Sequence, residues 1–193
     1  TTDEFVAKRI EDWPLDTKFV VRVGAYSVQE ILNHLTKAWA LGYSIFPNVP
    51  AIKNCLRKSQ FYELCLQNNI NIPKFQVFAE DGPDWHSIDF TEYGDCVIKP
   101  SIGTLGNGIY FVKPEDVPTM IVLDTLGYDI DFGTVSNVNK GGVAGPYFPD
   151  ENLKDECRKI CKATGNEFTC IDFLQDEQGK FYCLESNVAP HLY

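Results

Sequence analysis

Three oxygen-bearing side chains lie within one short segment near the end of the chain. Residues 169–190 read TCIDFLQDEQGKFYCLESNVAP, a pattern typical of two strands joined by a polar, glycine-containing turn. Because side chains alternate faces along a strand, this turn predicts Asp172 opposite Cys183 and diagonal to Glu185, with Asn187 on the same face. Diagonal neighbours lie roughly 7–8 Å apart at the backbone, within reach of one shared ligand.

Two carboxylates at this spacing need a compensating charge. Without one they repel each other, and one of them has to take up a proton. A divalent cation removes the repulsion, and ligands that are all oxygen suit Mg²⁺ or Mn²⁺ better than zinc. The sequence therefore predicts a metal site at Asp172, Glu185 and Asn187. The alternative is a solvated strand edge that carries scattered acidic residues.

A second segment combines a lysine with a glycine-rich loop. Residues 96–112 read CVIKPSIGTLGNGIYFV, which predicts a strand, a loop and a second strand, with Lys99 at the end of the first strand and Pro100 ending its pairing. Glycines let backbone N–H groups approach phosphate oxygens, and a lysine supplies a positive charge to the same anion. The candidate nucleotide contacts are Lys99, Ser101, Gly103, Thr104, Gly106, Asn107 and Gly108.

This loop fits neither of the two common glycine-rich phosphate motifs. No Gly-Lys-Ser/Thr follows it, as in a P-loop, and a strand rather than a helix comes next, unlike the dinucleotide fingerprint. An ordinary glycine-rich hairpin loop with a surface lysine is the alternative. A phosphate loop and a cation site in one chain together indicate a nucleoside triphosphate bound with its Mg²⁺.

Composition narrows the class of protein. The chain has 193 residues, a net charge of −10, 44% hydrophobic residues and 23% charged residues, which is ordinary for a globular protein. The negative charge argues against nucleic acid or an anionic membrane as the main partner. Seven scattered cysteines, an odd number, predict a reduced protein and hence a cytoplasmic location.

The remaining pattern predicts alternating strands and helices. Residues 27–42 have an amphipathic pattern with Ser27 as a capping residue and Gly42 as the stop signal, which predicts a helix between two short strands. The other predicted elements are one helix over 51–69, strands over 72–78 and 119–124, and a helix over 152–164. Most of residues 113–149 is rich in Gly, Asn and Asp, which predicts a long irregular loop.

The order of three motifs resembles a known family. VIKPSIGTLGNGIYFV, then SNVNKGG, then IDFLQDEQGKFYCLESNVAP resembles the ATP-grasp ligases, and most of all the RimK-like glutamate ligases. The resemblance spans roughly residues 19–190. It implies an α+β fold in which two subdomains, 51–115 and 116–193, grip ATP, with 1–50 as part of a preceding α/β unit. It also implies that the second subdomain is shorter than the family pattern.

The resemblance assigns roles to single residues. Asp172, Glu185 and Asn187 match metal ligands, and Lys99 and Lys58 match lysines that contact the nucleotide. Asn137 and Lys140, in SNVNKGG, match catalytic positions near the γ-phosphate and the acceptor. The family usually has Asp where this chain has Arg57, and often Arg where it has Lys140. Some thirty family residues that normally precede SNVNKGG, including those that hold adenine, have no counterpart here.

The activity implied by the resemblance is that of an ATP-dependent carboxylate–amine ligase. ATP would phosphorylate a carboxylate of a peptide, protein or small molecule, and an amine such as an amino acid would attack the acyl phosphate to form an amide. The expected cofactors are ATP and Mg²⁺ or Mn²⁺, and a homo-oligomer is compatible with the sequence. Two alternatives remain, a nucleotide-binding module without catalysis and a small-molecule kinase on the same fold.

Overall fold

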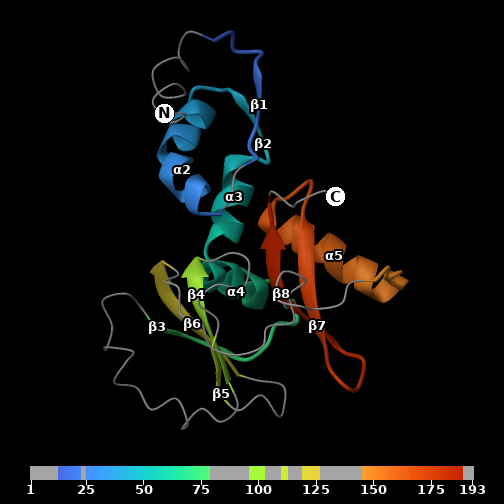
Figure 1. Cartoon of the computed structure of the whole chain (residues 1–193). Coiled ribbons are helices and arrows are strands. Elements are labelled where there is room, and N and C mark those ends of the chain that lie inside the picture. The colour runs from blue at the N-terminus through green and yellow to red at the C-terminus, as the bar shows by residue number, and fades with distance from the viewer. Residues whose placement is uncertain are drawn as a thin grey trace.

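The computed structural model describes residues 13–22, 25–78, 96–102, 110–112, 119–126 and 145–188. Its elements, in chain order, are β1 (Lys18–Val20), α2 (Ala25–Ala40), β2 (Ser44–Phe46), α3 (Val49–Leu56), α4 (Lys58–Gln67), β3 (Phe75–Phe78), β4 (Cys96–Ile102), β5 (Tyr110–Val112), β6 (Thr119–Leu126), α5 (Glu151–Thr164), β7 (Cys170–Gln175) and β8 (Phe181–Asn187). Figure 1 shows α4 in the middle, between the β3–β6 sheet on one side and the β7–β8 hairpin with α5 on the other.

The first unit is the predicted strand, helix and strand. β1 and β2 pair in parallel, and α2 connects them. The helix ends where the sequence predicts, because Gly42 adopts a φ of +96° and its N–H donates to the Trp39 carbonyl at 3.0 Å. The predicted cap at Ser27 is wrong. Helix α2 begins at Ala25, a strong helix former, so Ser27 lies inside the first turn.

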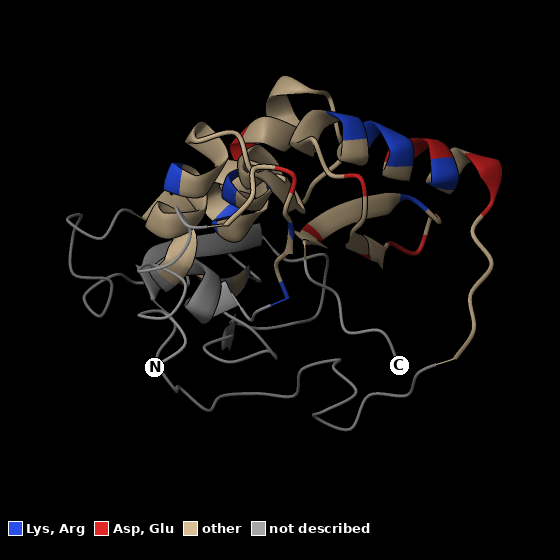
Figure 2. Ribbon diagram, turned by 90° about the horizontal axis from the view of Figure 1, so that it is seen from above, with Lys and Arg blue, Asp and Glu red and all other residues tan. Residues whose placement is uncertain are grey.

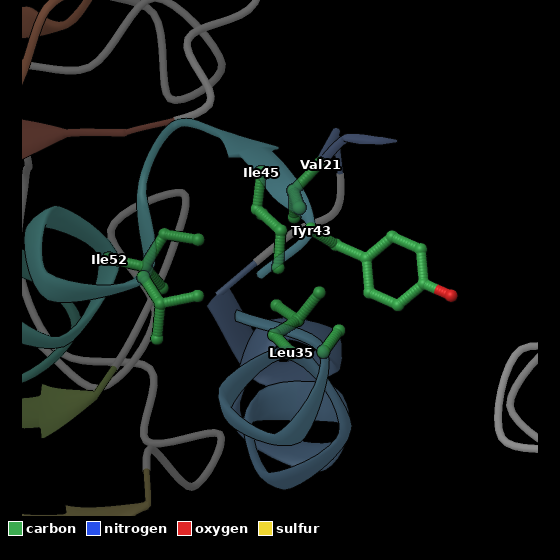
Figure 3. Packing of buried hydrophobic residues seen from close by; sticks show 7 residues of the cluster. Val21, Leu35, Tyr43, Ile45 and Ile52 are labelled. Carbon is green, nitrogen blue, oxygen red and sulfur yellow. The ribbon is translucent and has the colours of Figure 1, made fainter. Parts of the chain in front are cut away.

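An apolar cluster joins this unit together. Its buried members come from α2, α3, β2 and the residues that directly follow β1 or precede β2: Val21, Leu35, Ala38, Tyr43, Ile45, Val49 and Ile52. Figure 3 shows Val21 and Ile45 facing Leu35 of α2. At the edge of the cluster, the Tyr43 hydroxyl donates a hydrogen bond to the Trp13 carbonyl at 2.8 Å.

The single helix predicted over 51–69 is two helices. The chain is extended at Arg57, with φ −104° and ψ 126°, so α3 ends at Leu56 and α4 begins at Lys58. The two helices bury their apolar faces in different places. Ile52 of α3 packs in the cluster shown in Figure 3, whereas Phe61 of α4 packs against the C-terminal hairpin. Periodicity alone did not reveal this change of direction, since both helices are apolar on one side.

A four-stranded sheet carries the segment predicted to bind phosphate. Its strand order is β3–β6–β4–β5, with β6 parallel to β3 and β4, and β5 antiparallel to β4. The prediction that Pro100 ends the pairing is wrong, because Pro100 pairs with Leu123 and the strand continues to Ile102. In the part of the chain that the structure describes, the pairing of β5 with β4 reaches Ile98 and no strand pairs with Pro100 on that side, so its missing N–H is tolerated.

The β7–β8 hairpin packs on α4 and α5 through a second cluster, which we call the hairpin cluster. Its buried members are Phe61, Tyr62, Cys65, Ile70, Ile160 and Cys183. The N–H of Cys183 also donates to the Asn71 carbonyl at 2.8 Å, which fixes β8 against the turn that follows α4. The hairpin is therefore attached to the N-terminal half of the chain by apolar contacts and by a backbone hydrogen bond.

Helix α5 has the boundaries expected of an amphipathic surface helix. Asp150 caps its first turn by accepting from the N–H of Leu153 at 2.8 Å, and Gly165 ends it with a φ of +76°, as predicted. Basic and acidic bands follow one another along its outer face in Figure 2. The Nδ2 of Asn54 donates to the Thr164 carbonyl at 3.0 Å, which joins the end of α5 to α3.

The described residues combine helices with parallel and antiparallel strands, which is compatible with the predicted α+β class. The ATP-grasp assignment and the domain boundaries at residues 50 and 115 stay predictions. Within the described ranges, no helix is long and apolar enough to cross a membrane.

The hairpin cluster should carry much of the stability of the chain. Ile160 has 0% exposed surface, so Ile160→Ala removes three buried carbons and leaves a cavity. We expect the free energy of unfolding to fall by about 2–5 kcal/mol in urea denaturation. The control is Leu66→Ala on α4, where 57% of the leucine is exposed and the change should be small. Equal losses in both variants would contradict the assignment of Ile160 to the core.

Candidate functional site

The register of the hairpin differs from the prediction. Asp172 pairs directly with Glu185, and Cys183 pairs with Phe173, so the expected pairing of Asp172 with Cys183 is wrong. The ladder shifts by one residue between Asp172 and Phe173, and Leu184 is the extra residue of a bulge on β8. The two carboxyl groups are therefore opposite neighbours rather than diagonal ones, which brings them closer than the sequence suggested.

Part of this difference comes from the turn. It comprises the five residues 176–180, whereas the predicted register requires a turn of two or four residues. The N–H of Gly179 donates to the Asp176 carbonyl at 2.9 Å, and the N–H of Asp176 donates to the Lys180 carbonyl at 3.0 Å. Gly179 has a φ of +82°, which a glycine adopts without strain. The Asp176 carboxylate accepts from the N–H groups of Gln178 and Lys180 and holds the turn closed.

The structure brings the three predicted metal ligands onto one face of the hairpin. Glu185 and Asn187 are two residues apart on β8, so their side chains share one face, and Asp172 lies opposite Glu185 on β7. The Nδ2 of Asn187 donates to Oε1 of Glu185 at 3.0 Å. Ile171 and Phe173 point to the other face, where they pack against the hairpin cluster. The two carboxyl groups thus lie on the side of the hairpin that faces away from the hairpin cluster.

Lys58 reaches this face from α4. It is the first residue of the helix, and its Nζ lies 3.7 Å from Oε2 of Glu185, with 12% of the lysine side chain and 34% of the glutamate side chain exposed. A positive charge at a helix N-terminus is unfavourable, because the helix dipole is positive there too. Glu185 offsets that repulsion. The break at Arg57 is what places Lys58 at this end of α4.

Lys99 approaches from the sheet. Val97, Lys99 and Ser101 are spaced two residues apart along β4, so their side chains lie on one face of the strand. On that face the hydroxyl of Ser101 lies 3.0 Å from the hydroxyl of Ser59, the second residue of α4, and both serines are buried. The Ser59–Ser101 contact thus holds the first turn of α4 against β4, so that Lys99 and Lys58 come near each other.

Both lysines are destabilised in their charged form. Burial and the nearby charge of Lys58 together lower the pKa of Lys99 to about 8, although Glu185 and Asp172 act in the opposite direction. Burial also lowers the pKa of Lys58, against the opposing effect of Glu185. Each lysine would therefore gain from an additional anion.

The two carboxyl groups respond differently to their shared position. Burial and the facing Glu185 together raise the pKa of Asp172 to about 6. Burial also acts to raise the pKa of Glu185, but Lys58, the Asn187 amide and Lys99 outweigh it, so this pKa is lowered. Glu185 accordingly keeps its charge, and Asp172 is the member of the pair that takes up a proton as pH falls through about 6.

The other predicted contacts divide into two groups. Ser101, predicted as a phosphate donor, is fully buried and bonded to Ser59. Outside the described residues lie the glycine-loop positions Gly103, Thr104, Gly106, Asn107 and Gly108 and the catalytic candidates Asn137 and Lys140. Sequence reasoning missed Ser59, although it directly follows Lys58 and a helix boundary at Arg57 would have pointed to it.

The chemistry of the donor set fits a hard divalent cation. Two carboxyl groups and one amide oxygen are available on one face, and a cation could replace the proton that Asp172 takes up below about pH 6. Among the residues that the structure describes, no three His, Cys, Asp or Glu side chains gather closely enough to hold a metal alone. A cation here would need the Asn187 amide, water or a ligand to complete its shell.

Comparison with known proteins adds no assignment. No protein-family model matches the chain, and no curated protein matches it. We therefore infer the chemistry of the site from its own side chains and from their positions on α4, β4, β7 and β8.

The shared proton should be visible in the pH dependence of stability. Between the ordinary value of 3.8 and about 6, folded Asp172 retains a proton that the unfolded chain has released. The free energy of unfolding should therefore decrease as pH rises through this window. Asp172→Asn removes the titrating group, so its profile should lack this decrease in urea denaturation without divalent cations. Parallel profiles for the two chains would show that Asp172 is not perturbed by Glu185.

Proposed function

We propose that this site binds a nucleoside triphosphate together with a divalent cation. Lys58 and Lys99 would contact the phosphates, and Asp172, Glu185 and Asn187 would hold Mg²⁺ or Mn²⁺. One observation carries this proposal: two partly buried lysines from α4 and β4 converge on a pair of facing carboxyl groups from β7 and β8.

The two lysines would gain from a further anion and the two carboxyl groups from a cation, and a nucleoside triphosphate bound with its cation supplies both. The lysines lose charge stabilisation through burial and mutual repulsion, and phosphate oxygens would restore it. Burial and the charge of Glu185 disfavour ionisation of Asp172, and a cation would favour it. With both carboxylates ionised, their charges cancel those of the lysines, and the double positive charge of the cation then faces the phosphates. A purely structural ion pair between Lys58 and Glu185 would leave Lys99 and the proton on Asp172 unexplained.

The reaction that we assign is ATP-dependent ligation of a carboxylate to an amine, on an ATP-grasp fold. A carboxylate oxygen of the acceptor attacks the γ-phosphorus, ADP leaves, and an acyl phosphate forms. The amine of an amino acid then attacks the acyl carbon, loses a proton and displaces phosphate. A bound Mg²⁺ supplies charge neutralisation at the phosphates. This chemistry needs positioned charges and no nucleophile from the protein, which agrees with a site made of lysines and carboxyl groups.

The roles of Asn137 and Lys140 belong to the same proposal. The resemblance to the ATP-grasp ligases implies that both lie near the γ-phosphate and the acceptor, and their contribution would be to orient the acceptor. A cytoplasmic location, where ATP is abundant, is proposed with them.

The test of this function is the release of ADP under three conditions. The first condition contains Mg²⁺ and ATP, the second adds a glutamate-ended peptide as the carboxylate, and the third adds glutamate as the amine. A ligase should release stoichiometric ADP and phosphate and form an amide only when the peptide and the glutamate are both present. ADP release with the peptide alone and a stable phosphorylated product would favour a kinase. No release under any condition would favour a binding module.

Variants of Asp172 and Glu185 test whether the activity depends on the carboxyl pair. Asp172→Asn and Glu185→Gln keep the side-chain volume but remove one negative charge each, so turnover should fall by at least about 10²-fold, as for other groups that act on developing charge. Leu66→Ala is the control on an exposed face of α4. Wild-type turnover in either carboxyl variant would exclude the proposed metal site.

Lys99 should make nucleotide affinity dependent on pH. Its pKa of about 8 means that its charge is lost as pH rises through 8, and with it the attraction for phosphate. We therefore expect ATP affinity to decrease between pH 7 and pH 9. Lys99→Met should bind ATP more weakly at pH 7, by about one to two powers of ten, because a charge-assisted contact of roughly 1.5–3 kcal/mol is lost. An equally steep decrease in Lys99→Met, measured by calorimetry, would show that another group is responsible.

A further inference from the structure

The bulge on β8 decides which way Glu185 points. Cys183 and Glu185 are two residues apart, so a regular strand would put both side chains on the same face. Instead Cys183, which is completely buried, packs in the hairpin cluster, and Glu185 stands beside Asp172 on the opposite face. The extra residue Leu184 makes this reversal. Without the bulge, one of the two side chains would be on the wrong side of the hairpin.

A bulge leaves backbone groups outside the ladder. Leu184 has no partner residue on β7. A buried carbonyl without a hydrogen bond costs free energy, and such a bulge persists only where another group satisfies it. The hydroxyl of Tyr62 does so here, because it donates to the Leu184 carbonyl at 2.8 Å. Tyr62 has 1% of its surface exposed and belongs to the hairpin cluster.

Helix α4 therefore contacts β8 at two consecutive residues. Lys58 and Tyr62 are four residues apart, so they lie on the same side of α4, one turn from each other. Tyr62 binds the carbonyl of Leu184, and Lys58 pairs with the side chain of the next residue, Glu185. One contact fixes the backbone and the other fixes the carboxylate.

We infer that Tyr62 is a positioning residue of the cation site, and that its hydroxyl stabilises the Leu184 bulge that turns Glu185 toward Asp172. This inference rests on the proposed function, since it concerns the same carboxyl pair. Tyr62 itself touches neither the cation nor the nucleotide. It acts through the backbone of Leu184, as residues that hydrogen-bond to metal ligands orient those ligands in other metal sites.

The hydroxyl is suited to this role at all ordinary pH values. Burial raises the pKa of Tyr62 well above its usual value, and the negative charge of Glu185 raises it further. The group therefore stays protonated and remains a hydrogen-bond donor. On the other side of the bulge, the N–H of Cys183 is held by the Asn71 carbonyl at 2.8 Å. The bulged segment is thus fixed on both sides by groups that come from α4 and the turn after it.

Tyr62→Phe tests the inference, and the chain offers a matched control. Tyr43 is also buried, at 4% exposure, and its hydroxyl also donates to a backbone carbonyl at 2.8 Å, that of Trp13 in the first apolar cluster. Each Tyr→Phe change removes one oxygen and one hydrogen bond and keeps the ring. The two variants should lose similar amounts of stability in thermal unfolding.

The decisive readout is the binding of Mn²⁺ with adenylyl imidodiphosphate, followed by electron paramagnetic resonance of free Mn²⁺. We expect Tyr62→Phe to weaken Mn²⁺ binding by about 10–100-fold, the usual range for outer contacts of a metal site. Tyr43→Phe should bind Mn²⁺ as the wild-type chain does. This difference at similar stability supports a positioning role, because loss of stability alone would affect both variants alike.

Other results would overturn the inference in distinguishable ways. Wild-type Mn²⁺ affinity in Tyr62→Phe would remove the positioning role and leave the proposed function standing. Equal weakening in both variants would assign the effect to general destabilisation. Failure of the wild-type chain to bind Mn²⁺ with the nucleotide analogue would overturn both the positioning role and the proposed function.

Discussion

The contact between Lys58 and Glu185 is the interaction on which the site depends. It joins the N-terminus of α4 to the C-terminal hairpin, and it determines which of two facing carboxyl groups is charged. Because Lys58 stabilises the charge of Glu185, a proton taken up by the pair below about pH 6 goes to Asp172. The second lysine of the site, Lys99, forms no salt bridge with any residue that the structure describes. The site is therefore arranged around one internal ion pair, one displaceable proton and one lysine that would gain from an anion.

The fold serves this contact by making α4 a shared element. The Ser59–Ser101 contact holds its first turn against β4, and its apolar side packs under β7 and β8 in the hairpin cluster. Figure 1 shows the helix between these two sheets. Side chains separated by more than a hundred residues thus meet within a small space, and neither sheet alone would carry both kinds of charge.

Local signals in the sequence predicted much of this arrangement. Gly42 and Gly165 marked helix ends correctly, and the alternation in 169–190 identified the hairpin and the face shared by Glu185 and Asn187. Two features were not predictable in that way. The break at Arg57 lies inside a continuous amphipathic pattern, and only the two separate clusters explain it. The bulge at Leu184 depends on the Tyr62 hydroxyl, a contact across more than a hundred residues that no local pattern encodes.

The most direct measurement of the central claim is a calorimetric titration of ATP into the chain with and without Mg²⁺, at a pH below the Asp172 pKa of about 6. Our account predicts saturable binding that Mg²⁺ strengthens, with proton release as the cation replaces the proton on Asp172, visible as a dependence of the heat on the buffer. Asp172→Asn should bind without that proton release. Absence of ATP binding in both titrations, or equal affinity with and without Mg²⁺, would contradict the account.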